Sequence, residues 1–234
     1  MKIAIMQPYF LPYIGYFQLI NAVDKFVIYD NIQYTKKGWI NRNRILVDGK
    51  DEYITLPLKK DSDYLNVDQR RLADTFNDDA NKIVRKLAQA YKKAPHYQLV
   101  YPILQTIFEN PESNLFHFIH KSIVEICRLF DIKTELIISS SVSIDHSLKS
   151  QDKVIAVCKA LKATSYINLS GGVDLYSKEI FNENNIELNF IKTNSIHYPQ
   201  FNNEFVANLS VIDVMMFNSP EAIKTYLQTS FTIN

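Results

Sequence analysis

The sequence predicts an α/β protein with a parallel-sheet core, a β-hairpin and an all-helical insertion. Short apolar runs alternate with amphipathic helical segments in residues 131–190, the pattern of β-α-β units with right-handed crossovers. The segment 77–130 contains helical patterns alone, and 47% hydrophobic with 22% charged residues is the composition of an ordinary globular domain. We expect one domain over 1–234, with 1–76 and 131–234 as the α/β core and 77–130 as the insertion.

A strand, an aromatic loop, a helix and a second strand open the chain. Residues 3–6 form an apolar run typical of a strand that is buried on both faces. This run ends at Gln7-Pro8, because proline has no N–H to donate to a sheet. Pro12 suits the first turn of a helix whose apolar stripe continues to Ile20. The second strand is expected at residues 25–29.

The remaining elements follow from the same kinds of pattern. Residues 45–47 and 53–56, joined through Asp48-Gly49-Lys50, are typical of a β-hairpin. A short strand is expected at 64–67, and three helical patterns fill the insertion. After the insertion we expect a strand at 135–139, a helix at 149–161, a strand at 165–168, a helix at 174–181, a strand at 186–190 and a helix that begins near residue 208.

Polar side chains follow several of the predicted strands. The carboxyl ends of parallel strands, with the helix N-termini that follow them, line the ligand crevice of an open sheet, and their free N–H groups suit an anion. The alternative is that the tyrosines only pack and that Gln7 belongs to a turn. The residues expected at this edge are Gln7, Tyr9, Tyr13, Gly15 and Tyr16 after the first strand, Asp30 after the second, Ser140 after the strand at 135–139, and Ser170, Gly171, Gly172 and Tyr176 after the strand at 165–168.

The segment 31–44 is the most polar candidate for ligand binding. It holds four cations, several amides and the single tryptophan of the chain. Arg42 or Arg44 would bind a phosphate bidentately, and Lys36 or Lys37 would add a point charge. Trp39 would stack on a sugar or a base. Tyr34 and Asn41 are expected in the same substrate-binding set. A solvated loop with ordinary surface lysines is the alternative interpretation.

Several segments resemble the WbqC-like family. They are Gln7 to Phe17, Trp39 to Arg44, Thr164 to Gly172 and Asn208 to Asp213, so the resemblance extends over nearly the whole chain. Members of that family lie in bacterial gene clusters for O-antigen and other surface polysaccharides. The resemblance implies a transferase of lipopolysaccharide biosynthesis that modifies an amino sugar by attaching an aminoacyl or acyl group.

A second resemblance concerns the fold. Tyr13-Ile14-Gly15-Tyr16 stands where adenylyl- and cytidylyltransferases and pantothenate synthetase carry His-x-Gly-His after their first strand. This resemblance implies a nucleotidyltransferase-like, Rossmann-type core. Tyrosines replace both histidines here, and a phenol with a pKa of about 10 carries no positive charge at neutral pH. Nucleotidyl transfer is therefore only an alternative function.

The principal expectation is an enzyme that transfers the group directly to the amine of a nucleotide-linked amino sugar. Such a reaction needs a base and hydrogen-bond donors for the developing oxyanion. Asp30 or His197 is the candidate base and Tyr16 a candidate donor, while the donor substrate is a nucleotide or an activated acyl or aminoacyl compound. The other interpretation is a protein that binds a sugar nucleotide without catalysis.

Charge and cysteine content narrow the remaining classes. A net charge of +1 gives no basic field for nucleic acid, and no apolar run approaches the roughly 18 residues of a membrane span. The N-terminus lacks a signal-peptide pattern, so we expect a soluble, cytoplasmic protein. Cys127 and Cys158 are expected to be buried free thiols, and no motif indicates a metal site.

Overall fold

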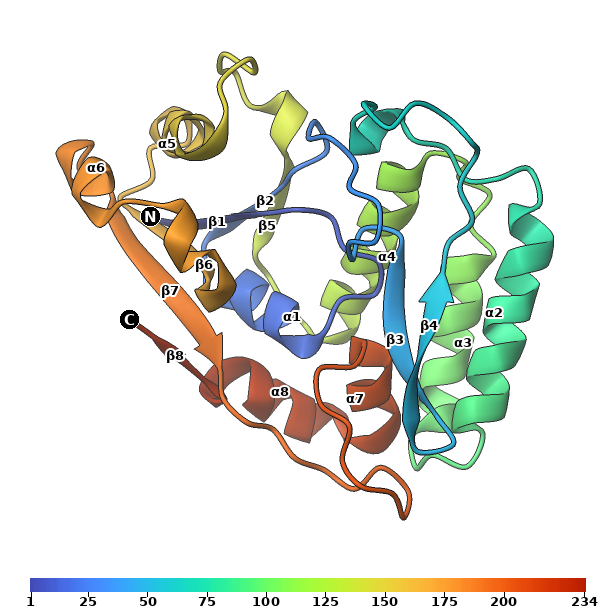
Figure 1. Ribbon diagram of the computed structural model, residues 1–234. Helices are drawn as coiled ribbons and strands as arrows, with labels where there is room; N and C mark the ends of the chain where they lie inside the picture. The colour runs from blue at the N-terminus through green and yellow to red at the C-terminus, as the bar shows by residue number, and fades with distance from the viewer.

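A six-stranded sheet and a separate two-stranded hairpin form the framework of the protein, which we describe from a computed structural model of residues 1–234 (Figure 1). The strands are β1 (Lys2–Met6), β2 (Lys25–Ile28), β3 (Arg42–Val47), β4 (Lys50–Thr55), β5 (Glu135–Ile138), β6 (Ser165–Leu169), β7 (Glu187–Thr193) and β8 (Phe231–Ile233). The α-helices are α1 (Ile14–Asn21), α2 (Phe76–Tyr91), α3 (Tyr97–Phe108), α4 (Leu115–Leu129), α5 (Ser150–Ala160), α6 (Lys178–Glu183), α7 (Val211–Phe217) and α8 (Pro220–Thr229). Short 3-10 turns are η1 (Val67–Gln69), η2 (Ser139–Ser141) and η3 (Ser170–Leu175).

The large sheet has the strand order β5-β2-β1-β6-β7-β8 and is parallel except for β8, which confirms the predicted fold class. From the central β1 the chain passes outward through β2 to β5, then returns to the other side of β1 and passes outward through β6 to β7. The strand order therefore reverses between β1 and β6. In a doubly wound sheet, the crevice at the carboxyl ends of the two strands beside such a reversal is the usual ligand site.

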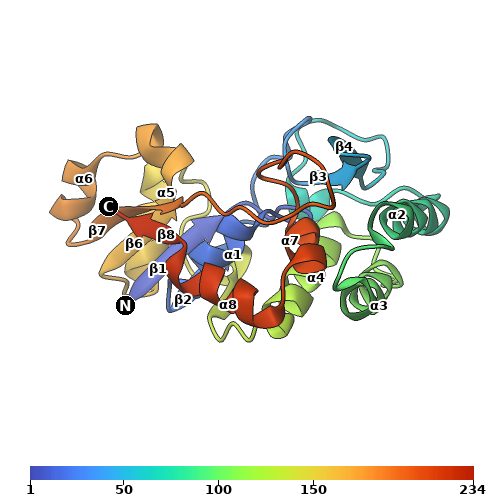
Figure 2. The same ribbon diagram turned by 90° about the horizontal axis from the view of Figure 1, so that it is seen from below.

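Alternate residues of each strand face different cores, as expected for a sheet covered on both faces. Ile3, Ile5 and Val27 belong to a cluster that includes apolar side chains of α5 and α6. Ala4 and Phe26 belong to the larger core, which extends through α1 and α8 to the hairpin and α2–α4. Figures 1 and 2 show α5 and α6 at the end of the molecule opposite α2 and α3.

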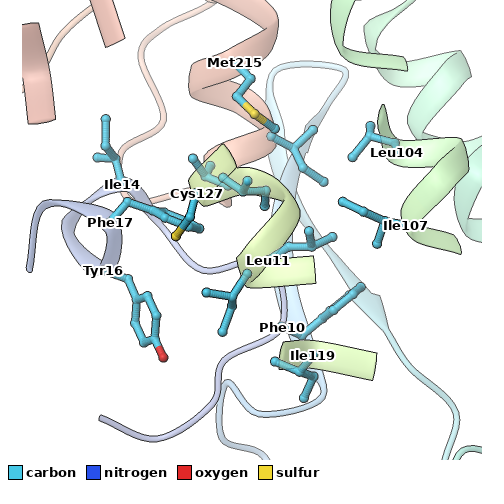
Figure 3. Close-up of a cluster of buried hydrophobic side chains, with 14 of the residues drawn as sticks. Phe10, Leu11, Ile14, Tyr16, Phe17, Leu104, Ile107, Ile119, Cys127 and Met215 are labelled. Atoms are coloured by element: carbon cyan, nitrogen blue, oxygen red, sulfur yellow. The ribbon is translucent and has the colours of Figure 1, made fainter. Parts of the chain in front are cut away.

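Helix α1 is fixed by burial on nearly all sides. It has 8 residues, and a helix this short has little stability of its own in water. Phe17 and Tyr16 are fully buried, and Figure 3 shows them in the cluster that Cys127 of α4 and Met215 of α7 complete. The start of α1, which borders the functional site, is therefore held rigidly against α4 and α7.

The β3–β4 hairpin was predicted, and its strands are longer than expected. Asp48 and Gly49 connect them with φ of 48° and 78°, the left-handed pair that a tight two-residue hairpin turn requires. The backbone N–H of Leu46 donates to the Tyr91 hydroxyl at 2.8 Å, which ties the hairpin to α2. The hairpin consequently has a fixed position beside the sheet.

One of the predicted elements is absent, and another begins later than predicted. Residues 64–67 form no strand, because Asn66 makes only one bridge, to Gln33, and caps the turn η1. In place of the helix expected at 174–181, η3 continues to Leu175, and α6 begins at Lys178 with Ser177 as its N-cap. The sequence patterns also gave no indication of α8 or of the antiparallel edge strand β8.

Both cysteines are buried free thiols, as predicted. Burial raises the pKa of each thiol to about 12, so neither is a reactive thiolate at neutral pH. None of the helices combines the length and the apolar character that spanning a membrane requires.

Candidate functional site

A cavity of about 580 Å³ lies at the point where the strand order reverses. We call it the main cavity. Met6 and Gln7 at the end of β1 and Asn168 and Leu169 at the end of β6 line it. The volume falls within the range of about 300–1,000 Å³ that is typical of small-molecule sites.

The bend after β1 supplies one wall of the main cavity. Gln7, Tyr9 and Tyr13 line it, whereas Tyr16 lies behind them in the core and donates from its hydroxyl to the Gln7 carbonyl at 3.0 Å. Burial raises the pKa of Tyr9 and Tyr13. Both phenols therefore stay neutral and can donate hydrogen bonds to a ligand. Tyr16, predicted as a catalytic donor, does not line the cavity, and its observed contact is with the backbone of Gln7.

Gly15 allows Tyr13 to adopt its position. A Cβ at Gly15 would lie 2.4 Å from Cε2 of Tyr13 and 2.5 Å from the Thr193 hydroxyl oxygen. The phenol ring of Tyr13 thus lies directly against the glycine. Gly15 was predicted to bind substrate, but it is buried and leaves space for a side chain that lines the cavity.

Residues 39–44, which include Trp39 and Arg44, form another wall of the main cavity and are hydrogen-bonded to the bend after β1. Asn43 donates from its side-chain amide to the carbonyls of Phe10 and Leu11 at 3.0 and 2.8 Å, and the Phe10 N–H donates to the Trp39 carbonyl at 3.1 Å. Trp39, Asn43 and Arg44 line the main cavity. The two segments that the sequence marked as candidates therefore border one shared space.

Arg44 is the one charged residue among those that line the main cavity. Its guanidinium contacts Asp51 at 3.0 Å and the Asn208 carbonyl at 3.3 Å, and it lies 5.5 Å from the Trp39 ring. The Nε atom is buried and has no hydrogen-bond partner. This cation is thus pre-positioned at the cavity wall.

Arg42 is engaged elsewhere. It donates to the carbonyls of Lys37 and Gly38 and lies 4.6 Å from the Tyr53 ring. Arg42 is not among the lining residues, nor is the exposed Lys37. The sequence named both arginines as candidates for a phosphate, and the geometry favours Arg44.

Tyr34 and Asn41 are buried and hydrogen-bonded to each other behind the cavity wall that Trp39 and Arg44 form. The Tyr34 hydroxyl donates to the Asn41 side-chain oxygen at 2.9 Å, and the Asn41 amide donates to the Leu56 carbonyl at 2.9 Å. Neither residue lines the main cavity, although both were predicted to bind substrate. Their contacts attach the loop before β3 to the chain that follows β4.

The turn after β6 closes the third side. Gly171, Gly172 and Tyr176 line the cavity there, together with Asn168. A Cβ on Gly172 would lie 2.7 Å from the Asn168 amide nitrogen, so the glycine lets this side chain approach the turn. Ser170 is exposed and is not a lining residue. The glycines of this turn were predicted to permit close approach of a ligand, and Gly171 has open space around it.

Two other predicted residues, Asp30 and Ser140, pair with each other. The buried Asp30 carboxylate accepts the Ser140 N–H at 2.9 Å and thereby joins the end of β2 to η2. Neither lines the main cavity. Asp30 is therefore poorly placed to take a proton from a molecule bound there.

His197 is exposed and lies close to a serine that the sequence analysis did not identify. Its Nε2 is 2.6 Å from the Ser195 hydroxyl oxygen, and its ring packs on Phe205 at 4.7 Å. Ser195 lines a second cavity whose wall includes Tyr13 and Asn208, residues that also line the main cavity. The i, i+2 spacing of Ser195 and His197 was the available signal in the sequence.

Three side-chain amides are among the other lining residues that sequence reasoning missed. Asn43, Asn168 and Asn208 all line the main cavity. Each falls inside a segment that carries the family resemblance. An asparagine has both donor and acceptor groups, which suits sugar hydroxyls, but the motif alone did not indicate which asparagine faces the ligand.

Comparison with known proteins places this geometry in a family. A protein of Mycobacterium tuberculosis named "Uncharacterized protein Rv1507c" is 28% identical over 229 residues, which cover 97% of this chain and 97% of that protein. No solved structure matches the chain. The sequence profile of the WbqC-like protein family matches residues 7–225 and so includes every residue that lines the main cavity except Ile5 and Met6 of β1. The chain belongs to the WbqC-like protein family.

Proposed function

We propose that this protein is a cytoplasmic enzyme of bacterial surface-polysaccharide (O-antigen) biosynthesis. It binds a nucleotide-linked amino sugar in the main cavity and transfers an acyl or aminoacyl group to the sugar amine. The observation that carries the proposal is the lining of the cavity, in which a single arginine stands among aromatic rings and side-chain amides at the reversal of the strand order.

The lining suits each part of such a molecule. Arg44 matches a diphosphate, because a guanidinium binds phosphate oxygens bidentately. Trp39 is stacked on Tyr53 and is still 38% exposed, so it offers aromatic surface for contact with a base or a sugar ring. Asn168 and Asn208 offer donors and acceptors for sugar hydroxyls. No carboxylate lines the main cavity, and the Asp51 carboxylate behind Arg44 is paired with that guanidinium at 3.0 Å.

The transfer step needs a base, and we assign that role to His197 acting through Ser195. The sugar amine attacks the carbonyl carbon of an activated acyl donor, such as a thioester, and a tetrahedral intermediate forms. One amine proton passes through the Ser195 hydroxyl to Nε2 of His197, 2.6 Å away. The intermediate then expels the thiolate, which takes up the proton that His197 received, so that the imidazole returns to its starting state. The neutral phenols of Tyr9 and Tyr13 are suited to donate to the developing oxyanion.

A turnover assay tests the proposal. Nucleotide-linked amino sugars are incubated with acyl thioesters, and mass spectrometry looks for an acylated product; the matching sugars with a hydroxyl in place of the amine serve as controls. We expect product from the amino sugars alone. His197→Ala should lower turnover by about 10²-fold or more without changing sugar-nucleotide affinity. The matched variant His117→Ala, which changes an exposed histidine of α4 that does not line the cavity, should leave turnover unchanged.

The alternatives give different results in the same experiment. A protein that only binds would retain affinity for sugar nucleotides and give no product with any donor. Nucleotidyl transfer would require a nucleoside triphosphate and would release pyrophosphate. The core position of Tyr16, which takes the place of the second motif histidine, disfavours that chemistry.

A further inference from the structure

A second, smaller cavity adjoins the main cavity. It has a volume of about 290 Å³ and lies beyond the end of β7, between the start of α1 and the strap formed by residues 194–209. We call it the side chamber. Tyr13 and Asn208 line both spaces and so form a shared wall between them. The two cavities therefore adjoin each other at these two residues.

The shared wall is held from two directions. The backbone carbonyl of Asn208 accepts from Arg44 at 3.3 Å, so the phosphate-matching cation and the wall are in contact. Tyr13 packs against Gly15 and lies beside Thr193, whose hydroxyl donates to Gln18 at 2.7 Å. These contacts fix the shared wall between the two cavities. Asn208 therefore lies between Arg44, which it contacts, and the side chamber, which it lines.

The side chamber differs chemically from the main cavity. Of its 12 lining residues, 8 are hydrophobic and none is charged. Ile14, Leu209 and Val214 are buried and Phe205 is partly buried, so much of its lining is apolar. Its polar atoms belong to hydroxyl and amide groups, which carry no charge.

The Asp213 carboxylate, which contacts the lining residue Tyr198, already accepts hydrogen bonds from three side chains. Tyr198, a lining residue, donates to Asp213 at 2.8 Å. The same carboxylate accepts from Gln200 at 2.6 Å and from Tyr91 at 2.9 Å, and Asp213 is fully buried. Its charge is therefore engaged by three donors and does not offer a partner to an ammonium group in the side chamber.

We infer that the side chamber holds the acyl group of the donor and that this group is an uncharged apolar chain rather than an aminoacyl group with a free ammonium. The inference rests on the proposed function and decides between its two classes of transferred group. An ammonium moved into the side chamber would lose part of its hydration to the apolar residues that line it, with no compensating charge among them. A methylene group moved into apolar surroundings gains binding energy instead. The reacting carbonyl then lies at the shared wall, and Ser195 lines the side chamber into which the acyl chain extends.

Binding of pantetheine thioesters to the protein tests the inference without requiring turnover. Calorimetry measures the affinity of acetyl, propanoyl, butanoyl, hexanoyl and glycyl thioesters in the absence of sugar. Affinity should rise by roughly fourfold for each added methylene until the side chamber is full. The glycyl thioester, similar in size to propanoyl but charged, should bind at least about tenfold more weakly than propanoyl.

Variants assign the effect to this space. Ala207→Trp and Asn194→Trp each place a large ring at an exposed residue that lines the side chamber, and Asn202→Trp does so on the same strap away from it. The first two should abolish the gain for longer chains and leave sugar-nucleotide affinity unchanged, and the third should alter neither. An unchanged chain-length profile in both lining variants, or equal affinity for glycyl and propanoyl thioesters, would overturn the inference. Failure of the proposed function has another signature, because the thioesters would then bind with this profile and yield no acylated sugar.

Discussion

The replacement of Arg44 by glutamine tests the assignment of the phosphate-binding group most directly. In the native protein Arg44 is held by Asp51, by the Asn208 carbonyl and by contact with Trp39, so little side-chain freedom remains to be lost on binding. A hydrogen bond to a charged group contributes about 1.5–3 kcal/mol, and a bidentate contact makes two. Taking the lower value for each gives a loss of about 3 kcal/mol, or roughly 100-fold in affinity.

Arg42→Gln is the matched control, because Arg42 lies two residues away on the same strand. Its guanidinium is engaged by the carbonyls of Lys37 and Gly38. We expect a change in sugar-nucleotide affinity of less than about threefold, since no phosphate contact is lost. Isothermal titration calorimetry with a nucleotide diphosphate sugar measures both variants, and thermal unfolding checks that they are folded.

The stability change at Arg44 should be small. Its ion pair with Asp51 is partly exposed, with side-chain exposures of 27% and 44%, and such pairs contribute about 1 kcal/mol or less. Thus the loss in affinity cannot be ascribed to unfolding. If Arg42→Gln weakened binding as much as Arg44→Gln, or if Arg44→Gln left affinity unchanged, the assignment of the phosphate to Arg44 would be refuted.

Two further predictions concern the walls of the site and the buried carboxylate. Gly15→Ala introduces a Cβ at 2.4 Å from the Tyr13 ring, so we expect a loss of about 1–3 kcal/mol in the free energy of unfolding and weaker sugar-nucleotide binding. Gly171→Ala is the control, because Gly171 has open space around it. Chemical denaturation should show almost no change in stability for that variant. Burial raises the pKa of Asp213, so the native state binds the Asp213 proton more tightly than the unfolded state does. The contribution of this proton to the free energy of unfolding is therefore greatest below about pH 4, the pKa of the unfolded state, and is lost as the pH rises through the native pKa. Asp213→Asn should remove this part of the pH dependence while costing about 2–4 kcal/mol through its three donors, and an identical pH slope in the wild type and the variant would contradict the shift.

The sheet was predictable because its strands are read from local patterns. The run at residues 3–6 and the later alternation of strands and helices determine a parallel core, and the turn at Asp48-Gly49 determines the hairpin. The strand expected at 64–67 is absent because Asn66 caps a 3-10 turn instead. β8 follows a helix with no turn signal, and its strand identity depends on pairing with β7, a contact that the local sequence does not contain.

The lining of the site was only partly predictable, because it depends on contacts between distant residues. Arg42 and Arg44 have the same side-chain chemistry, and because they are two residues apart on β3 they lie on the same face of the strand. What separates them is that Arg42 folds back on its own loop, while Arg44 meets the carbonyl of Asn208, 164 residues away. Similarly, Asp30 ends a strand at the expected edge, yet its carboxylate is directed to Ser140. Sequence position placed these residues near the site, and tertiary contacts determined which of them line it.

The bend after β1 explains why three remote segments form one site. Pro8 and Pro12 have no N–H, so the backbone between them is excluded from the sheet, and its buried carbonyls need other donors. Asn43 supplies donors to the carbonyls of Phe10 and Leu11.

The start of α7 supplies the remaining donors to the same bend. The Ser210 hydroxyl donates to the Leu11 carbonyl at 2.7 Å, and the Val211 N–H donates to the Pro12 carbonyl at 2.9 Å. The hydrogen bonds that the bend accepts therefore bring the arginine-bearing strand β3 and the strap, which includes Asn208, to the carboxyl end of β1. The hydrogen bonds to this proline-containing loop thus hold together the segments that form the main cavity and the shared wall.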